Sequence, residues 1–290
     1  MKIASLDKDT LRVHSSLGKS DSLAARLYTA LIGLPAVLLL IYAAPNEAVR
    51  ACFVAFAAWT TFEFARLTLV HIEGKTKLLL ITSNIFLTAL IFAAATSGKA
   101  LPQLSIVLNG IMIPALLGAF SKGTIEERAK ASAGSFLAVG YPICTWLAVW
   151  SLFGLSKNLL LLVLGCAWCS DTGAYFFGRT FGKKKLIPIL SPNKTWEGAI
   201  GGFICGVCAV VLFQAWLAPL ADWRITYLVA FLGAAAAQAG DLFKSLFKRN
   251  AGVKDSGKLL PGHGGLIDRV DSVLLASLVV WLLVALTQLD

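Results

Sequence analysis

The chain has 290 residues, of which 57% are hydrophobic and 14% are charged, and its mean hydropathy is +0.76. Soluble globular domains carry roughly 25% charged residues, so this composition excludes an ordinary soluble domain. The formal charge of +10 at pH 7 does not indicate nucleic-acid binding, because the loops of membrane proteins also collect basic residues.

Apolar runs long enough to cross a bilayer recur from residue 27 to the C-terminus. An α-helix needs about 20 apolar residues for this, so we expect an all-α fold: a polytopic integral membrane protein with about nine transmembrane helices. The fourth predicted span is the weakest, because Asn109 and Pro114 interrupt it, although membrane helices tolerate such breaks. The predicted spans cover roughly residues 27–44, 48–70, 78–97, 101–120, 132–155, 158–178, 197–219, 223–243 and 266–288.

The spans divide the chain into three predicted regions. Residues 1–26 form an N-terminal tail, which is polar and mixed in charge and does not resemble a cleavable signal. Residues 27–155 form an N-terminal transmembrane region of five spans. Residues 156–290 form a C-terminal transmembrane region of four spans with two basic loops, and we expect the catalytic residues there.

The distribution of basic residues predicts an orientation. Nine spans place the two termini on opposite sides of the membrane. One side then receives all of the 26 basic residues except Arg50, Lys99, Lys157 and Arg224. Loops rich in lysine and arginine stay in the cytoplasm. We therefore expect the N-terminus and the basic loops to face the cytoplasm, with the protein in the inner (plasma) membrane of the cell.

The first 130 residues hold few chemical signals. Glu63 and Arg66 stand three residues apart near the end of the second span, and we expect an ordinary ion pair between them. The six cysteines all lie inside apolar runs and include two C-x-x-C pairs. Because these pairs fall within predicted helices and lack the polar turn of a zinc knuckle, we favour helix packing over zinc binding.

Polar residues become dense in residues 170–202, SDTGAYFFGRTFGKKKLIPILSPNKTWEGAIGG. Asp171 lies inside an apolar run, where an unpaired carboxylate costs about 2.5–3.5 kcal/mol, so we expect it to have a partner or a function. The short loop that follows carries Lys183, Lys184 and Lys194 and would touch anionic headgroups. Ser191 or Thr195 can cap the next helix.

Small residues recur at intervals of four on both sides of this loop. Such stripes let helices approach closely. The stripe on the seventh span fits either packing within the chain or contact in a homodimer. The two stripes are Ser170, Ala174 and Gly178 before the loop, and Gly198, Gly202 and Gly206 after it.

The densest polar stretch, residues 245–271, lies between the last two spans. Five cations outnumber three carboxylates there, so we expect it to bind an anion, and the carboxylates favour a divalent metal ion. Asp241 and Asp268 lie near the same end of spans joined by one loop, so we predict that they hold one ion between them. The charged residues of the stretch are Lys248, Arg249, Lys254, Lys258, Arg269, Asp255, Asp268 and Asp271.

This stretch resembles the signature of the phosphatidate cytidylyltransferases, also called CDP-diglyceride synthetases. The segments SDTGAYFFG, FGKKKL and SPNKTWEG are similar to a second block of that family, with Asn193 where relatives often have lysine. The resemblance covers roughly residues 165–271. The matching signature residues are Ser245, Phe247, Lys248, Arg249, Lys254, Asp255, Gly257, Leu260, Pro261, His263, Gly264, Gly265, Leu266, Asp268, Arg269, Val270 and Asp271.

The resemblance implies an enzyme that transfers the cytidylyl group of CTP to phosphatidic acid, releasing pyrophosphate and giving CDP-diacylglycerol. The lipid phosphate would attack the α-phosphate in line, assisted by metal. The implied cofactors are Mg²⁺ and, as a second ion, K⁺. The expected partners are CTP, phosphatidic acid, anionic membrane lipids and a second copy of the chain, but no nucleic acid.

The same interpretation assigns roles to individual residues. The expected catalytic residues are Asp241, Asp268, Lys248, Arg249 and Arg269. The expected metal ligands are Asp241, Asp268, Asp271 and Asp171. The expected substrate-binding residues are Lys194, Lys183, Lys184, Ser245, Lys254, Asp255, Lys258, His263, Gly264 and Gly265. The lipid phosphate needs no general base, so His263 is expected to hydrogen-bond the loop or a phosphate rather than to take part in catalysis. The two glycines would let backbone N–H groups approach a phosphate.

Two other functions stay open. Another CTP-dependent lipid enzyme, a polyprenol kinase or a CDP-archaeol-type synthase, would need similar charges. A cation transporter could use Asp171, Asp241 and Asp268 as an ion path. A transporter predicts charges in both halves of the bilayer, whereas these carboxylates gather toward the cytoplasmic side.

Overall fold

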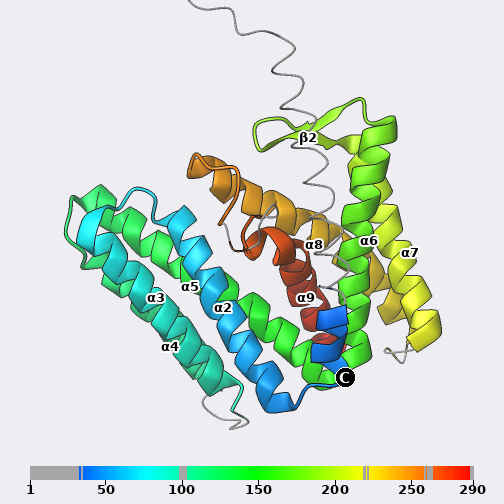
Figure 1. Cartoon of the computed structure of the whole chain (residues 1–290), viewed down its shortest axis with the longest axis horizontal. Coiled ribbons are helices and arrows are strands. Elements are labelled where there is room, and N and C mark those ends of the chain that lie inside the picture. Colours follow the sequence, from blue (N-terminus) through cyan, green and yellow to red (C-terminus); the bar gives the residue numbers. More distant parts are fainter. Residues whose placement is uncertain are drawn as a thin grey trace, which may run out of the picture.

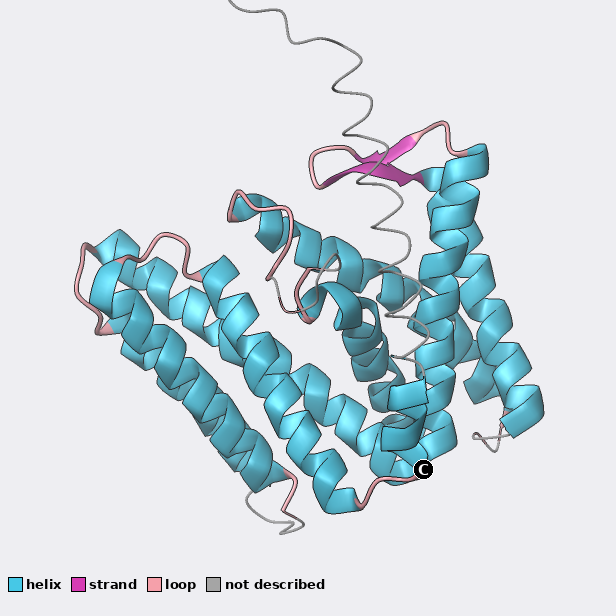
Figure 2. Ribbon diagram, viewed as in Figure 1, coloured by secondary structure: helices cyan, strands magenta, loops and turns pink. Residues whose placement is uncertain are grey.

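The structure is a computed structural model, and it describes Gly33 and residues 35–97, 103–217, 220, 222–257, 259 and 264–287. The described chain is helical almost throughout, with one small antiparallel hairpin (Figures 1 and 2). The helices, in chain order, are α2 (Asn46–Thr68), α3 (Gly74–Ala95), α4 (Gln103–Ala119), α5 (Ile125–Leu155), α6 (Lys157–Phe181), α7 (Trp196–Leu217), α8 (Trp223–Asn250) and α9 (Ile267–Thr287). The strands are β1 (Lys185–Ile187) and β2 (Ser191–Thr195).

The prediction of an all-α polytopic membrane protein is confirmed. Within the described residues, seven helices are long and apolar enough to cross a membrane: α2, α3 and α5 to α9. The fourth predicted span corresponds to α4, whose apolar part, Gly110–Ala119, is shorter. Residues 27–32 and 34 of the first predicted span, 27–44, lie outside the described residues, and residues 35–42 of it are helical.

Helix α5 begins earlier than the sequence analysis expects, at Ile125 instead of residue 132. The Thr124 side chain accepts a hydrogen bond from the backbone N–H of Glu127, and the Glu127 carboxylate accepts one from the backbone N–H of Thr124. This reciprocal capping satisfies N–H groups that have no partner within the helix. The polar residues 125–131 therefore form the first turns of a long helix.

The two halves of the chain form one bundle. Helices α2 to α5 lie on one side and α6 to α9 on the other (Figure 1). The largest buried apolar cluster draws on both halves, so burial of apolar surface holds them together. Its members include Phe53 of α2, Trp146 of α5, Val163 of α6, Val229 of α8 and Val280 of α9.

The glycine stripe of α7 packs against α6 within the same chain. A Cβ atom added at Gly202 would lie 2.6 Å from the carbonyl oxygen of Ser170 and 2.7 Å from Cβ of Ala174. A Cβ atom at Gly198 would lie 2.8 Å from the carbonyl oxygen of Ala174. The two small-residue stripes thus face each other, and α7 does not offer its stripe to a second chain. Homodimerisation remains a prediction of the resemblance.

The loop between α6 and α7 contains the β1–β2 hairpin, which the sequence analysis did not predict. The carboxylate of Glu197, in the first turn of α7, accepts hydrogen bonds from the backbone N–H groups of Lys183 and Lys184. Thr195 caps α7, as its side chain accepts a bond from the backbone N–H of Gly198. Both ends of the hairpin are therefore tied to the helix that follows it.

The contact between α6 and α7 makes a testable prediction. Gly202→Ala should lower the thermal unfolding midpoint of the detergent-purified protein, since overpacking costs about 1–3 kcal/mol. Gly154→Ala is the matched control, because a Cβ atom there meets nothing within 4 Å and alanine favours helix. Equal midpoints for the two variants would contradict the close packing.

Candidate active site

Three helices and the hairpin bring charged side chains together at one end of the bundle. Helix α8 contributes residues from its C-terminal part, α9 from its first turns, α6 from its C-terminal half, and β2 one lysine that reaches α8. We call these residues the charge cluster: Asp171 of α6, Lys194 of β2, Asp241, Lys244 and Lys248 of α8, and Asp268 and Asp271 of α9.

Lys244 is the centre of the charge cluster. Its Nζ atom lies 3.0 Å from Oδ1 of Asp241, 2.6 Å from Oδ2 of Asp271 and 3.5 Å from Oδ1 of Asp268. The Lys244 side chain is only 7% exposed. A buried ammonium is stable only beside opposite charge, and here three carboxylates from two helices share it.

Asp241 is the most accessible of the three carboxylates around Lys244, with 29% of its side chain exposed. Its second oxygen, Oδ2, lies 2.6 Å from Nζ of Lys194, so a lysine of the hairpin reaches across to α8. Asp171 is linked to the cluster through α9, because the hydroxyl of Ser272 donates a hydrogen bond to its Oδ1 atom at 3.1 Å.

Asp268 organises the segment that precedes α9. Its Oδ2 atom accepts hydrogen bonds from the backbone N–H and the hydroxyl of Ser256, at 2.8 and 2.9 Å, and from the backbone N–H of Gly265, at 3.2 Å. Its Oδ1 atom accepts a bond from Nζ of Lys248 at 2.7 Å. Asp268 therefore holds both the loop and a lysine of α8.

The donor chemistry of the cluster fits a hard divalent cation. The prediction that Asp241 and Asp268 come together is consistent with the geometry, since both carboxylates lie within 3.5 Å of the same positive charge. Four aspartates and three lysines also leave the cluster with a net negative charge. Carboxylate oxygens are the ligands that Mg²⁺ prefers in proteins. Among the described residues, no group of three or more His, Cys, Asp or Glu side chains already stands in metal-binding geometry.

Several predicted site residues lie around the cluster. The Arg249 side chain donates from Nε to the carbonyl oxygen of Leu190, which ties the end of α8 to the hairpin. The Ser245 hydroxyl donates to the backbone oxygen of Asp241. Gly264 has φ +82°, a conformation suited to glycine. Other predicted residues are exposed at this end of the bundle: Lys183, Lys184, Lys254, Asp255 and Arg269. Lys258 and His263 lie outside the described residues.

Lys244 is not among the predicted site residues, and the predicted partner of Glu63 is wrong. Lys244 stands three residues after Asp241, and that spacing alone could have suggested the pair. Among the described contacts, Glu63 makes no ion pair with Arg66, whose guanidinium lies 5.6 Å from the ring centroid of Phe62. The Glu63 carboxylate instead contacts the segment before α9. A glutamate inside a predicted span was the available signal, since such residues need partners.

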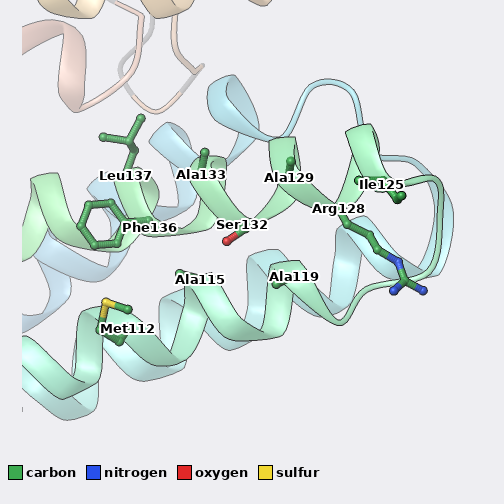
Figure 3. A pocket seen from close by; sticks show the side chains of 10 residues that line it. All are labelled: Met112, Ala115, Ala119, Ile125, Arg128, Ala129, Ser132, Ala133, Phe136 and Leu137. Atoms are coloured by element: carbon green, nitrogen blue, oxygen red, sulfur yellow. The ribbon is translucent and has the colours of Figure 1, made fainter.

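A separate groove of about 730 Å³ lies between α4 and α5. Small side chains line it, including Ala115 and Ala119 on α4 and Ala129 and Ala133 on α5, and Arg128 extends at one end (Figure 3). None of its lining residues belongs to the charge cluster or to the predicted site. The groove therefore lacks the chemistry expected of the site.

The fold and the cluster define a multi-pass membrane protein with a charged site at one end of its helix bundle. The chain belongs to the cytidylyltransferase family, which it matches over residues 24–287.

Similar curated proteins carry the name phosphatidate cytidylyltransferase. The one from Mycobacterium leprae is 40% identical over 159 residues, which are 54% of this chain and 50% of the relative. That from Staphylococcus haemolyticus is 49% identical over 115 residues, 40% of this chain and 44% of the relative. That from Haemophilus influenzae is 47% identical over 119 residues, 40% of this chain and 41% of the relative. The chain thus spans about half the length of the curated relatives it matches, or less.

Removing the shared ammonium should destabilise the fold. Lys244→Met leaves three neighbouring carboxylates without their common partner, and breaking a buried ion pair costs about 3–5 kcal/mol. We expect a large drop in the thermal unfolding midpoint in detergent. Lys130→Met removes an exposed ion pair with Glu126 and should leave the midpoint nearly unchanged. Equal drops for the two variants would contradict the central place of Lys244.

Proposed function

We propose that this protein transfers the cytidylyl group of CTP to phosphatidic acid, forming CDP-diacylglycerol and releasing pyrophosphate. Membership of the cytidylyltransferase family and the names of similar proteins support this. The observation that carries the proposal is that the carboxylates of Asp241 and Asp268 both lie within 3.5 Å of the Lys244 ammonium. Lys194 and Lys248 each contact one of these carboxylates. These groups suit a reaction between two anionic phosphates.

The reaction needs position and charge neutralisation more than it needs a protein nucleophile. An oxygen of the phosphatidate phosphate is already anionic near neutral pH, so it can attack the α-phosphorus of CTP directly. A bond forms between that oxygen and the α-phosphorus, while the bond from the α-phosphorus to the bridging oxygen breaks and pyrophosphate leaves. The protein lowers the barrier by aligning the two substrates and by placing positive charge near the developing negative charge.

The lysines of the charge cluster are the nearest source of that positive charge. Lys194 belongs to the hairpin and Lys248 to α8, so two different elements supply these lysines to the cluster. Lys183, Lys184 and Lys254 are exposed at the same end and would attract the triphosphate and anionic headgroups. The exposed Arg249 and Arg269 would add to this field.

We propose Asp241 and Asp268 as ligands of Mg²⁺, with Asp271 and Asp171 beside them. When bound, Mg²⁺ neutralises charge on the triphosphate. In the structure, Lys244, Lys194 and Lys248 hold these carboxylates close together. A second, monovalent ion, K⁺, and a homodimer are further proposals that rest on the family resemblance.

We propose that the cluster faces the cytoplasm in the plasma membrane. Most basic residues of the second half lie between Arg179 and Lys194 or between Lys244 and Arg269. Lys157 begins α6 and Arg224 lies at the start of α8, at the opposite ends of these helices. Because basic loops remain in the cytoplasm, this arrangement gives soluble CTP direct access to the site.

The rival functions differ in their products. Purified protein incubated with CTP, phosphatidate and Mg²⁺ should release pyrophosphate and form a CDP-lipid. A polyprenol kinase would instead give CDP and a phosphorylated alcohol. A transporter would pass cations across proteoliposomes without CTP turnover, but the carboxylates gather in one cluster instead of along a path, which favours a reaction site.

Neutralising either proposed metal ligand should remove most activity. Asp241→Asn and Asp268→Asn should each reduce Mg²⁺-dependent pyrophosphate release by about 100-fold, since each removes charge stabilisation from the transition state. Asp268→Asn should also lower stability, because its amide would face N–H donors of the loop. Lys157→Ala, at the far end of α6, should change activity little. Near wild-type rates in both aspartate variants would overturn the metal assignment.

A further inference from the structure

Glu63 of α2 lies in the interior, with 1% of its surface exposed. Its Oε1 atom accepts hydrogen bonds from the indole N–H of Trp59 and the backbone N–H of Leu266, both at 2.9 Å. Its Oε2 atom accepts bonds from the backbone N–H of Ile267 at 2.9 Å and the hydroxyl of Ser256 at 3.0 Å. Four donors thus surround this buried carboxylate, and three of them belong to the segment that leads into α9.

This arrangement caps α9 from another helix. The first N–H groups of a helix lack partners within it and are usually satisfied by a polar side chain just before the helix. That position is occupied by Leu266, whose carbonyl accepts the first helical bonds of α9 but whose side chain has no acceptor. Glu63 supplies the missing acceptor, and its negative charge suits the positive end of the α9 dipole.

Glu63 and Asp268 share one hydroxyl group. The oxygen of Ser256 lies 3.0 Å from Oε2 of Glu63 and 2.9 Å from Oδ2 of Asp268. A serine hydroxyl has a single proton to donate, so the two carboxylates are coupled through it. The position of Glu63 therefore bears directly on the position of Asp268.

The loop is built to approach Glu63 closely. A Cβ atom added at Gly257 would lie 2.7 Å from Oε1 of Glu63, and one at Gly265 would lie 2.5 Å from its Oε2 atom. Only glycine leaves room for this contact. Apolar packing fixes the same region from the side, since Phe64 and Leu67 of α2 are buried against Ile267 of α9.

We infer that Glu63 is a positioning residue, which acts from the N-terminal half of the chain to hold Ser256, Leu266 and Ile267 and thereby Asp268. It lies outside the charge cluster and works through the α9 amides and Ser256. The inference rests on the proposed function for its kinetic consequence, but its structural part can be measured without any activity.

The structural part is tested by backbone hydrogen exchange in the detergent-purified full chain. Glu63→Gln places an amide N–H₂ group where two donors now point, so it breaks bonds to the loop. Exchange of the segment 264–267 should become at least about tenfold faster, which corresponds to roughly 1.4 kcal/mol of lost hydrogen bonding. Unchanged exchange there would overturn the inference, whether or not the protein turns over CTP.

The kinetic part compares kcat and KM for CTP, per folded molecule and well below the unfolding midpoint. Loss of a supporting partner behind a metal ligand typically costs about 10–100-fold, so kcat of Glu63→Gln should fall by that factor. KM should change little, because Glu63 does not touch the substrate. Wild-type kcat in the folded variant would overturn the inference. An inactive wild-type protein would instead count against the proposed function, and the exchange result alone would decide the inference.

The matched control is Thr61→Val on the same helix. The Thr61 hydroxyl is buried and pairs with that of Thr88 on α3, away from the loop. This variant should lose stability but keep wild-type kcat and wild-type exchange in the segment 264–267. A loss of kcat in Thr61→Val equal to that in Glu63→Gln would reduce the role of Glu63 to general stability and overturn the inference.

Ser256→Ala provides a second variant that leaves the two amide bonds of Glu63 in place. It should lower kcat by a smaller factor than Glu63→Gln. Combining the two substitutions should cost less than the product of the separate losses, because both act through the same contact. Independent effects would contradict the coupling. If Glu63→Gln does not fold, Glu63→Asp, which keeps the charge but shortens the side chain, decides the question by the same exchange measurement at residues 264–267.

Discussion

The structure depends on keeping buried negative charge in a helix bundle otherwise made of apolar surface. Asp241, Asp268 and Asp271 share the ammonium of Lys244. Removing charges from water costs several kcal/mol per ion unless each finds a partner. The register of α8 against α9 is therefore set by charge as well as by packing, since a shift along either helix would separate the aspartates from Lys244. The hairpin serves the same purpose, because its Lys194 forms an ion pair with Asp241.

The N-terminal half contacts the surroundings of the charge cluster through α2. Glu63 reaches the segment before α9 from about two hundred residues away in the sequence, and Phe64 packs beside Phe243 and Phe247 of α8. Helix α2 thus contacts both helices that carry the proposed metal ligands. This gives a physical reason for the first spans to accompany a site whose recognisable motifs lie entirely in the second half.

The sequence was sufficient for features that depend on local patterns. Hydropathy predicted the long helices, and the single loop between two spans predicted that Asp241 and Asp268 lie near each other, as they do on either side of Lys244. Their role as metal ligands stays a prediction. The sequence was insufficient where a hydrogen-bonding partner lies far along the chain or where a local pattern is ambiguous. The acceptor that caps α9 could not be inferred from Leu266 itself, because it is supplied by Glu63. The hairpin was not predicted, because each of its strands has five residues or fewer. Such strands are too short to show the alternation of apolar and polar residues that indicates a β-strand. The early start of α5 was missed because the capping by Thr124 lies inside a polar segment.

The lysines of the cluster have two uses under the proposed function. Without substrate they neutralise the aspartates, which lowers the cost of burying these carboxylates in the bundle. Under that proposal the aspartates would hold a divalent cation that accompanies the triphosphate, and the lysines would lie beside the phosphates. In such an exchange neither the aspartates nor the lysines would be buried without groups of opposite charge. The bonds of Asp268 to Ser256 and Gly265 would keep it in place as its cationic partners change, and Glu63 contacts the same serine.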